Sequence, residues 1–263
     1  MFSKIERIPM LPTDSPLDPV VLLVACRKLD EAEELASDRL TRLTRATPVD
    51  RLAAARATRA LADILLEAGK NQQAAPHVFE ARRRYRPFRN DPALSAEVDL
   101  TLAEYAFADD HSYEGEQILT EATARSADVP GAELPHARLL RYSAHIQIVR
   151  VELEKGDALM TEAVQVAQRA VQTARSTSRA AAAEPLLLLS QYLFTHGEVA
   201  FMKDDPTRAR ALVSAALDLT ETDLREYIEY VRFARGRAAH AHRVFGDMTT
   251  AEELEARAEG RHG

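Results

Sequence analysis

Apolar residues recur every three or four positions along most of the chain from residue 20 onward, which is the spacing of one face of an α-helix. Two clear series are Leu139, Tyr142, Ile146, Val149 and Leu153, and Leu186, Leu189, Leu193 and Val199. The pattern predicts helices over residues 20–28, 31–45, 48–68, 71–86, 92–108, 112–127, 135–155, 158–176, 185–202, 206–219, 223–245 and 249–259.

Three of these helices carry a start signal, a capping side chain followed by proline: Thr47–Pro48, Asp91–Pro92 and Asp205–Pro206. Residues 1–19 lack helical periodicity and contain Pro9, Pro12, Pro16 and Pro19. Because each proline disfavours helix in the residue before it, this segment is predicted to be an extended arm. Residues 20–263 then form a single helical domain.

Short corners rich in aspartate and glycine separate the helices at intervals of roughly 40–48 residues, the length of a helical repeat. They are Gly69, Lys70 and Asn71; Asp109 and Asp110; Gly156 and Asp157; Asp204 and Asp205; Gly246 and Asp247; and, more weakly, Leu29 and Asp30. Alanines seven residues apart, which share a helix face, follow three of them: Ala163 and Ala170, Ala209 and Ala216, and Ala251 and Ala258. The pattern predicts stacked helical hairpins.

Over residues 48–260 the chain resembles the tetratricopeptide repeat (TPR) superfamily. The residues that carry the resemblance are the run from Asp204 to Ala209 with Ala216, Gly156 and Asp157 with Ala163 and Ala170, and Gly246 and Asp247 with Ala251 and Ala258. The resemblance implies an all-α, right-handed superhelix of about five or six antiparallel hairpins. It also implies a concave groove, lined by the first helix of each hairpin, that binds peptides or partner proteins.

Polar residues on the first helices are the candidates for this groove: Gln147, Arg150, Gln191, Tyr192, Glu198, Arg232, His240 and Arg243. Arginine and tyrosine in a concave wall suit a carboxylate or an acidic peptide, through forked hydrogen bonds and cation–π contacts. The alternative is that they are ordinary exposed residues, with Arg150 pairing with Glu154 four residues on. Leu187, Leu189, Ala209 and Ala216 are expected to be buried and to serve stability alone.

One dense basic run contains Arg82, Arg83, Arg84, Arg86 and Arg89, with Tyr85 and Phe88 among them. Cations at the end of a helix offset its dipole, which is the favoured interpretation. An acidic protein surface is the first alternative, and nucleic acid, whose bases would stack on the aromatic rings, is the second.

Composition narrows the class of protein. The chain has 46 Ala and 31 Leu against 16 Val and 7 Ile, and only 9 Gly, which favours helices and excludes a turn-rich β-sandwich or barrel. The net charge of −7 does not suggest a nucleic-acid partner. No stretch approaches the roughly 20 apolar residues of a transmembrane helix.

The sequence offers no familiar catalytic or metal site. The single cysteine, Cys26, excludes an internal disulfide and argues against a thiolate zinc site. His240 and His242 would point in different directions on a helix and could not share a metal. The acidic run from Asp109 to Glu114 loosely resembles the magnesium motif of terpenoid synthases, but at a corner it is expected to cap the next helix. We therefore predict no catalytic residue, metal or cofactor.

The sequence thus predicts a non-enzymatic module of the bacterial cytoplasm that binds a protein or peptide. An acidic protein or peptide is one candidate partner. The bacterial source is inferred from 29 Arg against 5 Lys, a bias typical of GC-rich genomes. The alternative function is a ligand sensor resembling the helical-repeat domains of transcription regulators, acting through another chain. The alternative location is a lipid anchor at Cys26, because residues 23–26 resemble a lipobox.

The first helix has its own prediction. Residues 20–25 are apolar on every side, so most of the helix surface must be covered. At the start of a stack, such a helix would cover the open end.

Overall fold

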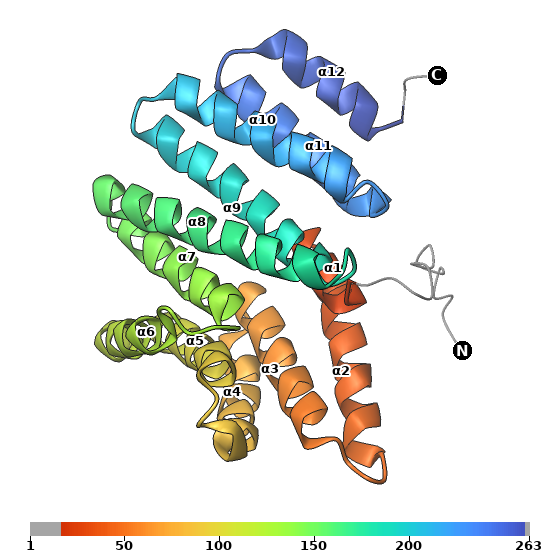
Figure 1. The fold of residues 1–263 in the computed structure, drawn as a ribbon, viewed down its shortest axis with the longest axis vertical. Helices are drawn as coiled ribbons and strands as arrows, with labels where there is room; N and C mark the ends of the chain where they lie inside the picture. The colour runs from red at the N-terminus through yellow and green to blue at the C-terminus, as the bar shows by residue number, and fades with distance from the viewer. Residues whose placement is uncertain (1–16, 261–263) are drawn as a thin grey trace.

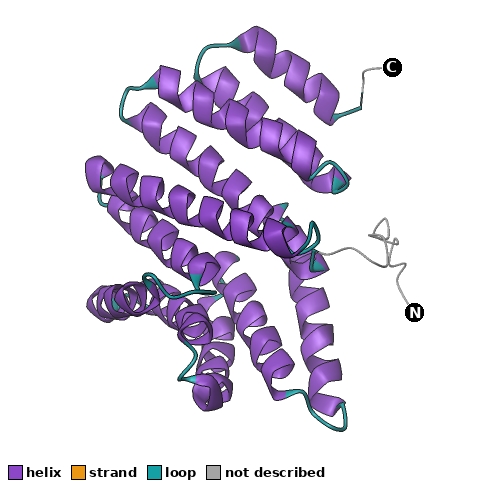
Figure 2. Ribbon diagram, in the orientation of Figure 1, coloured by secondary structure: helices purple, strands orange, loops and turns teal. Residues whose placement is uncertain are grey.

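A computed structural model describes residues 17–260, and this part of the chain is built from α-helices with one short 3₁₀-helix and contains no strand (Figure 2). The prediction of an all-α protein is confirmed. The α-helices are α1 (Pro19–Ala25), α2 (Leu29–Arg45), α3 (Arg51–Glu67), α4 (Asn71–Tyr85), α5 (Pro92–Ala108), α6 (Ser112–Ser126), α7 (Glu133–Val149), α8 (Leu153–Thr177), α9 (Ala183–Met202), α10 (Pro206–Asp223), α11 (Ile228–Val244) and α12 (Met248–Ala258). The 3₁₀-helix η1 (Arg86–Phe88) follows α4.

The helices pack in consecutive pairs: α1 with α2, α3 with α4, and so on to α11 with α12. Within each pair the turn contains one residue with a left-handed backbone. These residues are Arg27, Gly69, Asp110, Val151, Asp204 and Gly246, about 40 residues apart except for one longer interval. The second helix of a pair then contacts the first helix of the next, and α3, α5, α7 and α9 also contact one another in sequence. Figure 1 shows this progression from the red and orange helices to the blue ones.

Two of the three proline start signals are confirmed. Asp91 caps α5 by accepting hydrogen bonds from the backbone of Ala93 and Leu94, and Asp205 caps α10 in the same way. The prediction at Thr47–Pro48 was wrong: this peptide bond is cis and lies in the loop before α3. Helix α3 begins later because the side chain of Asp50 accepts a hydrogen bond from the Ala53 N–H and supplies the cap.

The corner predicted at Gly156 and Asp157 was also wrong, because both residues lie inside α8. The turn between α7 and α8 lies at residues 150–152, where Val151 has the positive φ angle. Gly156 serves close packing instead: a Cβ added there would lie 2.7 Å from the Ile148 side chain of α7. Such a position requires a small residue for contact between the helices rather than for chain reversal.

Most predicted core positions are buried. Leu187, Leu189, Ala209 and Ala216 are all in the core, and so are Ala163, Ala170 and Ala251. Ala258 is only half-buried, in the last helix. The alanines that lie seven apart therefore mark the buried face of α8 and α10, as their spacing predicts.

Helix α1 does not cover an open end of the stack, which corrects the prediction for residues 20–25. Leu17, Leu22 and Ala25 join the hydrophobic cluster of α7 to α11, whereas Val20 and Leu23 join the cluster of α2 to α4. Helix α1 lies where these two groups of helices meet (Figure 1). Most of this apolar helix is covered there because it has neighbours from both groups, while Val21 and Val24 remain half-buried.

Of the arm predicted for residues 1–19, residues 1–16 lie outside the described part of the chain. Leu17 is buried, Asp18 caps α1 by accepting a hydrogen bond from the Val20 N–H, and Pro19 is already helical. Cys26 follows α1 and is half-buried as a free thiol; burial raises its pKa to about 11. No helix among residues 17–260 is long and apolar enough to cross a membrane.

Candidate functional site

The candidate site is a cavity of about 240 Å³ between α1 and the row of first helices α3, α5, α7 and α9. We call it the inner cavity. A second cavity of about 710 Å³ adjoins it, and the two share the lining residues Val20, Val21, Arg59, Ala60, Arg138 and Glu184. The inner cavity exists because the row of first helices presents one continuous face and α1 covers only part of it.

One part of the cavity wall is apolar. Helix α1 contributes Val20, Val21 and Val24, α5 contributes Leu100, and α9 contributes Leu187 and Leu188. Burial of apolar surface against such a wall stabilises a ligand by about 25 cal/mol per Å².

A second part of the wall holds charges that are paired within the protein. The Arg59 guanidinium donates to Asp63 at 2.7 Å and lies 3.6 Å from Glu97. The Thr101 hydroxyl donates to Asp63, and the Tyr85 hydroxyl to Glu97, which joins α3, α4 and α5. Burial works against the charge on Arg59, but the two carboxylates outweigh burial and raise its pKa. The positive charge of Arg59 is therefore paired within the protein and is not available to a ligand.

Two further ion pairs bring helices together around the cavity. Arg138 of α7 donates to Glu184 of α9 at 2.5 Å. Arg27, in the turn after α1, pairs with Glu67 of α3. These four side chains hold neighbouring helices and are not free for a ligand.

The remaining polar groups of the cavity have no such partner. The side chains of Glu104 of α5 and Arg141 of α7 both line the cavity. Neither side chain makes a hydrogen bond or ion pair with any residue in the described part of the chain. The Tyr192 hydroxyl is buried with no hydrogen-bond partner among residues 17–260, and the Tyr192 side chain lines the same cavity. Burial, and then the nearby Asp63 carboxylate, raise the pKa of Glu104 to about 8, so it is largely protonated at neutral pH.

This arrangement is suited to binding. It offers a cation and a carboxyl group beside an apolar wall, and a few polar groups on a mainly apolar wall are the usual composition of a small-ligand pocket. Over the described residues, no three histidine, cysteine or carboxylate side chains lie close enough together to hold a metal ion.

The structure brings only two of the eight predicted groove residues into the inner cavity, Gln191 and Tyr192 of α9. The others lie elsewhere, and most have partners: Arg150 with Glu116, Glu198 with Arg237, Arg232 with Glu229, and Arg243 with Glu255. Gln147 lies near the end of α7 and His240 is exposed on α11. Arg150 does not pair with Glu154 because the chain turns at Val151 between them.

Sequence reasoning missed the residues that carry most of the cavity chemistry: Arg59, Asp63, Glu104, Arg138 and Arg141. A signal was present. Glu97 and Glu104 lie seven residues apart, hence on one face of α5. Arg59 and Asp63 lie four residues apart, and Arg138 and Arg141 three, so each pair also shares a helix face.

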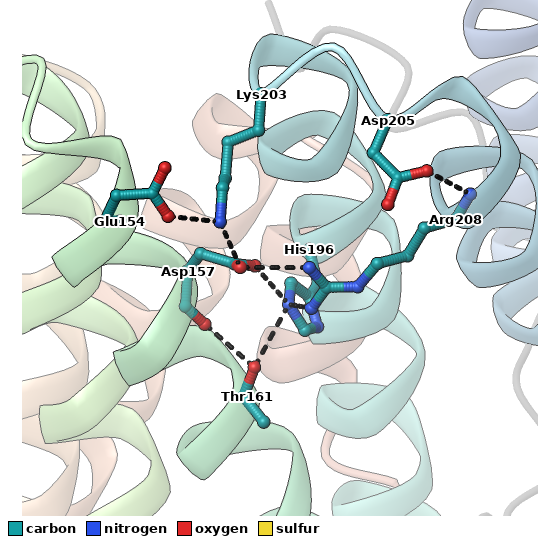
Figure 3. Close-up of polar contacts among 7 residues, drawn as sticks. All are labelled: Glu154, Asp157, Thr161, His196, Lys203, Asp205 and Arg208. Carbon is teal, nitrogen blue, oxygen red and sulfur yellow. Dashed lines mark hydrogen bonds and ion pairs between the residues drawn. The ribbon is translucent and has the colours of Figure 1, made fainter.

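A second cluster of buried charge surrounds Asp157 of α8, and we call it the Asp157 cluster (Figure 3). Asp157 accepts hydrogen bonds from Lys203 at 2.7 Å and Arg208 at 2.9 Å, and His196 Nε2 lies 2.9 Å from its other oxygen. Burial alone would raise the pKa of Asp157, but these three partners hold it well below its usual value. The cluster joins α8 to α9 and α10.

The predicted basic run lies away from the inner cavity. Arg82, Arg83, Arg86 and Arg89 line a surface groove of about 880 Å³ between α4, α5 and α6, and Arg84 pairs with Glu80 beside it. The opposite wall is acidic, with Asp109, Glu114 and Glu121, and Asp99 pairs with Arg125. The groove is therefore polarised rather than basic throughout, and charge alone does not select an acidic partner.

No protein-family model matches this chain, and no curated protein matches it. A solved structure does match: the crystal structure of BtubC (BKLC) from P. vanneervenii, which is 18% identical in sequence. The match covers 88% of this chain and 89% of that chain, with a TM-score of 0.57. At this identity the likeness shows a shared fold over most of both chains.

Proposed function

We propose that the chain is a right-handed, TPR-like superhelix and that it works as a non-enzymatic binding module with the inner cavity as its ligand site. The consecutive helix pairs and the row formed by α3, α5, α7 and α9 support the superhelix. In this arrangement the first helices form the concave face, and the inner cavity lies on that face.

The observation that carries the proposal is the position of α1 between the two groups of helices. The concave face already holds one apolar helical segment, since Val20 and Leu23 pack against α2 to α4 while Leu17 and Leu22 pack with α7 to α11. Unpaired polar groups remain in the cavity beside this segment. The chain recognises a partner protein or peptide that inserts one of its ends into that remaining space.

Site-specific cross-linking in the full chain tests this proposal. A photo-reactive amino acid replaces Gln191 in the cavity or, as the matched control, exposed Gln168 on the outer helix α8. We expect a partner from the source cell to be cross-linked from position 191 and not from position 168. Equal cross-linking from both positions, or none from position 191, would contradict the proposal.

A ligand-sensing protein is the second candidate, favoured by the size of the cavity. The cavity volume of about 240 Å³ is below the roughly 300–1,000 Å³ of sites for drug-sized ligands, so the cavity suits a ligand smaller than a typical drug. Native mass spectrometry of the purified chain separates the two functions. A small molecule that is released on unfolding supports the sensor, whereas a free chain that cross-links a protein at position 191 supports the interaction module.

A further inference from the structure

An unpaired carboxyl group and an unpaired guanidinium group line the same cavity without meeting. Glu104 projects from α5 and Arg141 from the neighbouring α7, and they interact electrostatically but form no ion pair. The other charged groups of the wall are occupied: Arg59 by Asp63 and Glu97, and Arg138 by Glu184. The cavity therefore presents one available carboxyl group and one available guanidinium group.

A ligand that pairs with Arg141 and with the ionised form of Glu104 must itself carry both signs of charge. A guanidinium group binds a carboxylate through two parallel hydrogen bonds, and a carboxylate binds an ammonium group through a charge-assisted hydrogen bond. A ligand with a single charge would leave one of the two groups unpaired.

The rest of the ligand must be apolar. Val21 and Val24 of α1 and Leu188 of α9 form the wall beside the charged groups. The volume of about 240 Å³ leaves room for one or two amino-acid side chains.

We propose that the inner cavity binds a small apolar zwitterion, with its ammonium group at Glu104, its carboxylate at Arg141 and its apolar side chain against α1. Free apolar amino acids and short apolar peptides share this chemistry. The inference rests on the proposed function, because it assumes that the inner cavity is the ligand site, and it adds the ligand class.

Proton release accompanies binding. Glu104 faces Arg59 and Asp63 of α3 and Arg138, Arg141 and Tyr142 of α7, and burial keeps it protonated near neutral pH. An ammonium ligand requires the ionised carboxylate. Affinity therefore rises with pH, up to about tenfold per unit, until the pH passes the pKa of Glu104 near 8.

Calorimetric titration of the full chain with four probes tests the ligand class: L-leucine, L-leucyl-L-leucine, N-acetyl-L-leucine and L-leucinamide. We expect one of the two zwitterions to bind at one site, which identifies free amino acid or peptide as the source. The singly charged derivatives, which lack either the ammonium group or the carboxylate, bind at least tenfold more weakly.

Variants assign each end of the ligand. Arg141→Gln removes the preference for L-leucine over L-leucinamide, and Glu104→Gln removes both the preference over N-acetyl-L-leucine and the rise of affinity with pH. Exposed Arg83→Gln on α4 is the control and binds as the native chain does. Circular dichroism verifies that each variant is folded, and the probe preferences of the native chain remain a test in themselves.

Failure of both zwitterions to bind at millimolar concentration overturns the inference, and so does equal affinity for all four probes. If a partner is still cross-linked from position 191, the proposed function survives and only the ligand class is wrong. If neither result is obtained, the inner cavity is not the ligand site.

Discussion

The inner cavity and the Asp157 cluster both bring charged side chains of successive helix pairs together, yet they differ in how completely these side chains are paired. In the Asp157 cluster one carboxylate contacts Lys203, Arg208 and His196 (Figure 3). In the inner cavity, Glu104 and Arg141 stay apart across open space. The Asp157 carboxylate is paired at both oxygens, which indicates a structural role, whereas the unpaired side chains beside the inner cavity indicate a binding role. Within the Asp157 cluster, the Nδ1 atom of His196 is buried without a hydrogen-bond partner among residues 17–260.

The physical reason is desolvation. A buried charge costs several kcal/mol unless a partner offsets the loss of water. The protein itself offsets this cost at Asp157, so removal of that partner harms folding. At the inner cavity the cost falls on Glu104, which lowers it by remaining protonated, whereas Arg141 is exposed and keeps its contact with water. A ligand that pairs with both groups would offset it.

The largest expected effect is at Asp157. Asp157→Ala leaves Lys203 and Arg208 without their buried partner, and we expect a loss of about 3–5 kcal/mol in the free energy of unfolding, measured with urea. Glu154→Ala is the control, because Glu154 also pairs with Lys203 but is 85% exposed, and its loss should be below about 1 kcal/mol. Similar losses in both variants would contradict the structural role of the cluster.

The native contribution of Asp157 also depends on pH in a defined direction. Its pKa is lower in the folded chain than in the unfolded chain, so the stabilisation is present above about pH 4 and is lost as the pH falls.

Helix α1 connects the two groups of helices, and weakening its packing should give the next largest loss of stability. Leu22→Ala deletes a buried side chain, and we expect a loss of about 2–4 kcal/mol with no loss of helix content by circular dichroism. The control, Val49→Ala, changes an exposed side chain and should cost less than about 0.5 kcal/mol. If Leu22→Ala is as mild as the control, α1 is not seated between the two groups.

Glu104 gives an effect that depends on pH. Its pKa is raised by folding from an ordinary value of 4.5 to about 8, so the native chain loses stability as the pH rises through this range. Glu104→Gln does not ionise, so between pH 4.5 and pH 8.5 the native chain should lose up to about 4 kcal/mol of unfolding free energy relative to this variant, at about 1.4 kcal/mol per pKa unit. A constant difference across this range would show that Glu104 is an ordinary exposed carboxylate.

Short-range signals in the sequence predicted most of the fold. The Asp91 and Asp205 caps act within three residues, and the helical spacing extends over each whole helix. Gly156 misled the prediction because glycine serves both chain reversal and close helix contact, and only the neighbouring Ile148 decides between them. The seat of α1 depends on how helices distant in sequence meet, which no local pattern contains.

The candidate site was predicted less well for the same reason. Gln191 and Tyr192 were identified from their position on a first helix. Whether a charge is paired depends on residues far along the chain: Asp63 meets Thr101, and Arg138 meets Glu184. The helical spacing places Glu97 and Glu104 on one face of α5. Only the structure shows that Glu97 is paired with Tyr85 and Arg59, whereas Glu104 has no such partner.

The smallest effect is expected at Arg150, a groove candidate that the structure places outside the inner cavity. It pairs with Glu116 at the surface, where a single ion pair contributes below about 1 kcal/mol. Arg150→Ala should therefore change neither the urea midpoint measurably nor the affinity for L-leucine. A tenfold loss of affinity would move the ligand site toward the end of α7.

The most direct test of the contrast measures both stability and affinity in the same two variants, Asp157→Asn and Arg141→Gln. Urea unfolding gives the first quantity, and calorimetric titration with the zwitterion that binds the native chain gives the second. We expect Asp157→Asn to lower the unfolding free energy by about 2 kcal/mol or more with unchanged Kd, and Arg141→Gln to leave stability within about 0.5 kcal/mol and weaken binding at least tenfold. The opposite pattern, a destabilised Arg141→Gln chain with native Kd, would contradict the division between a structural and a binding cluster.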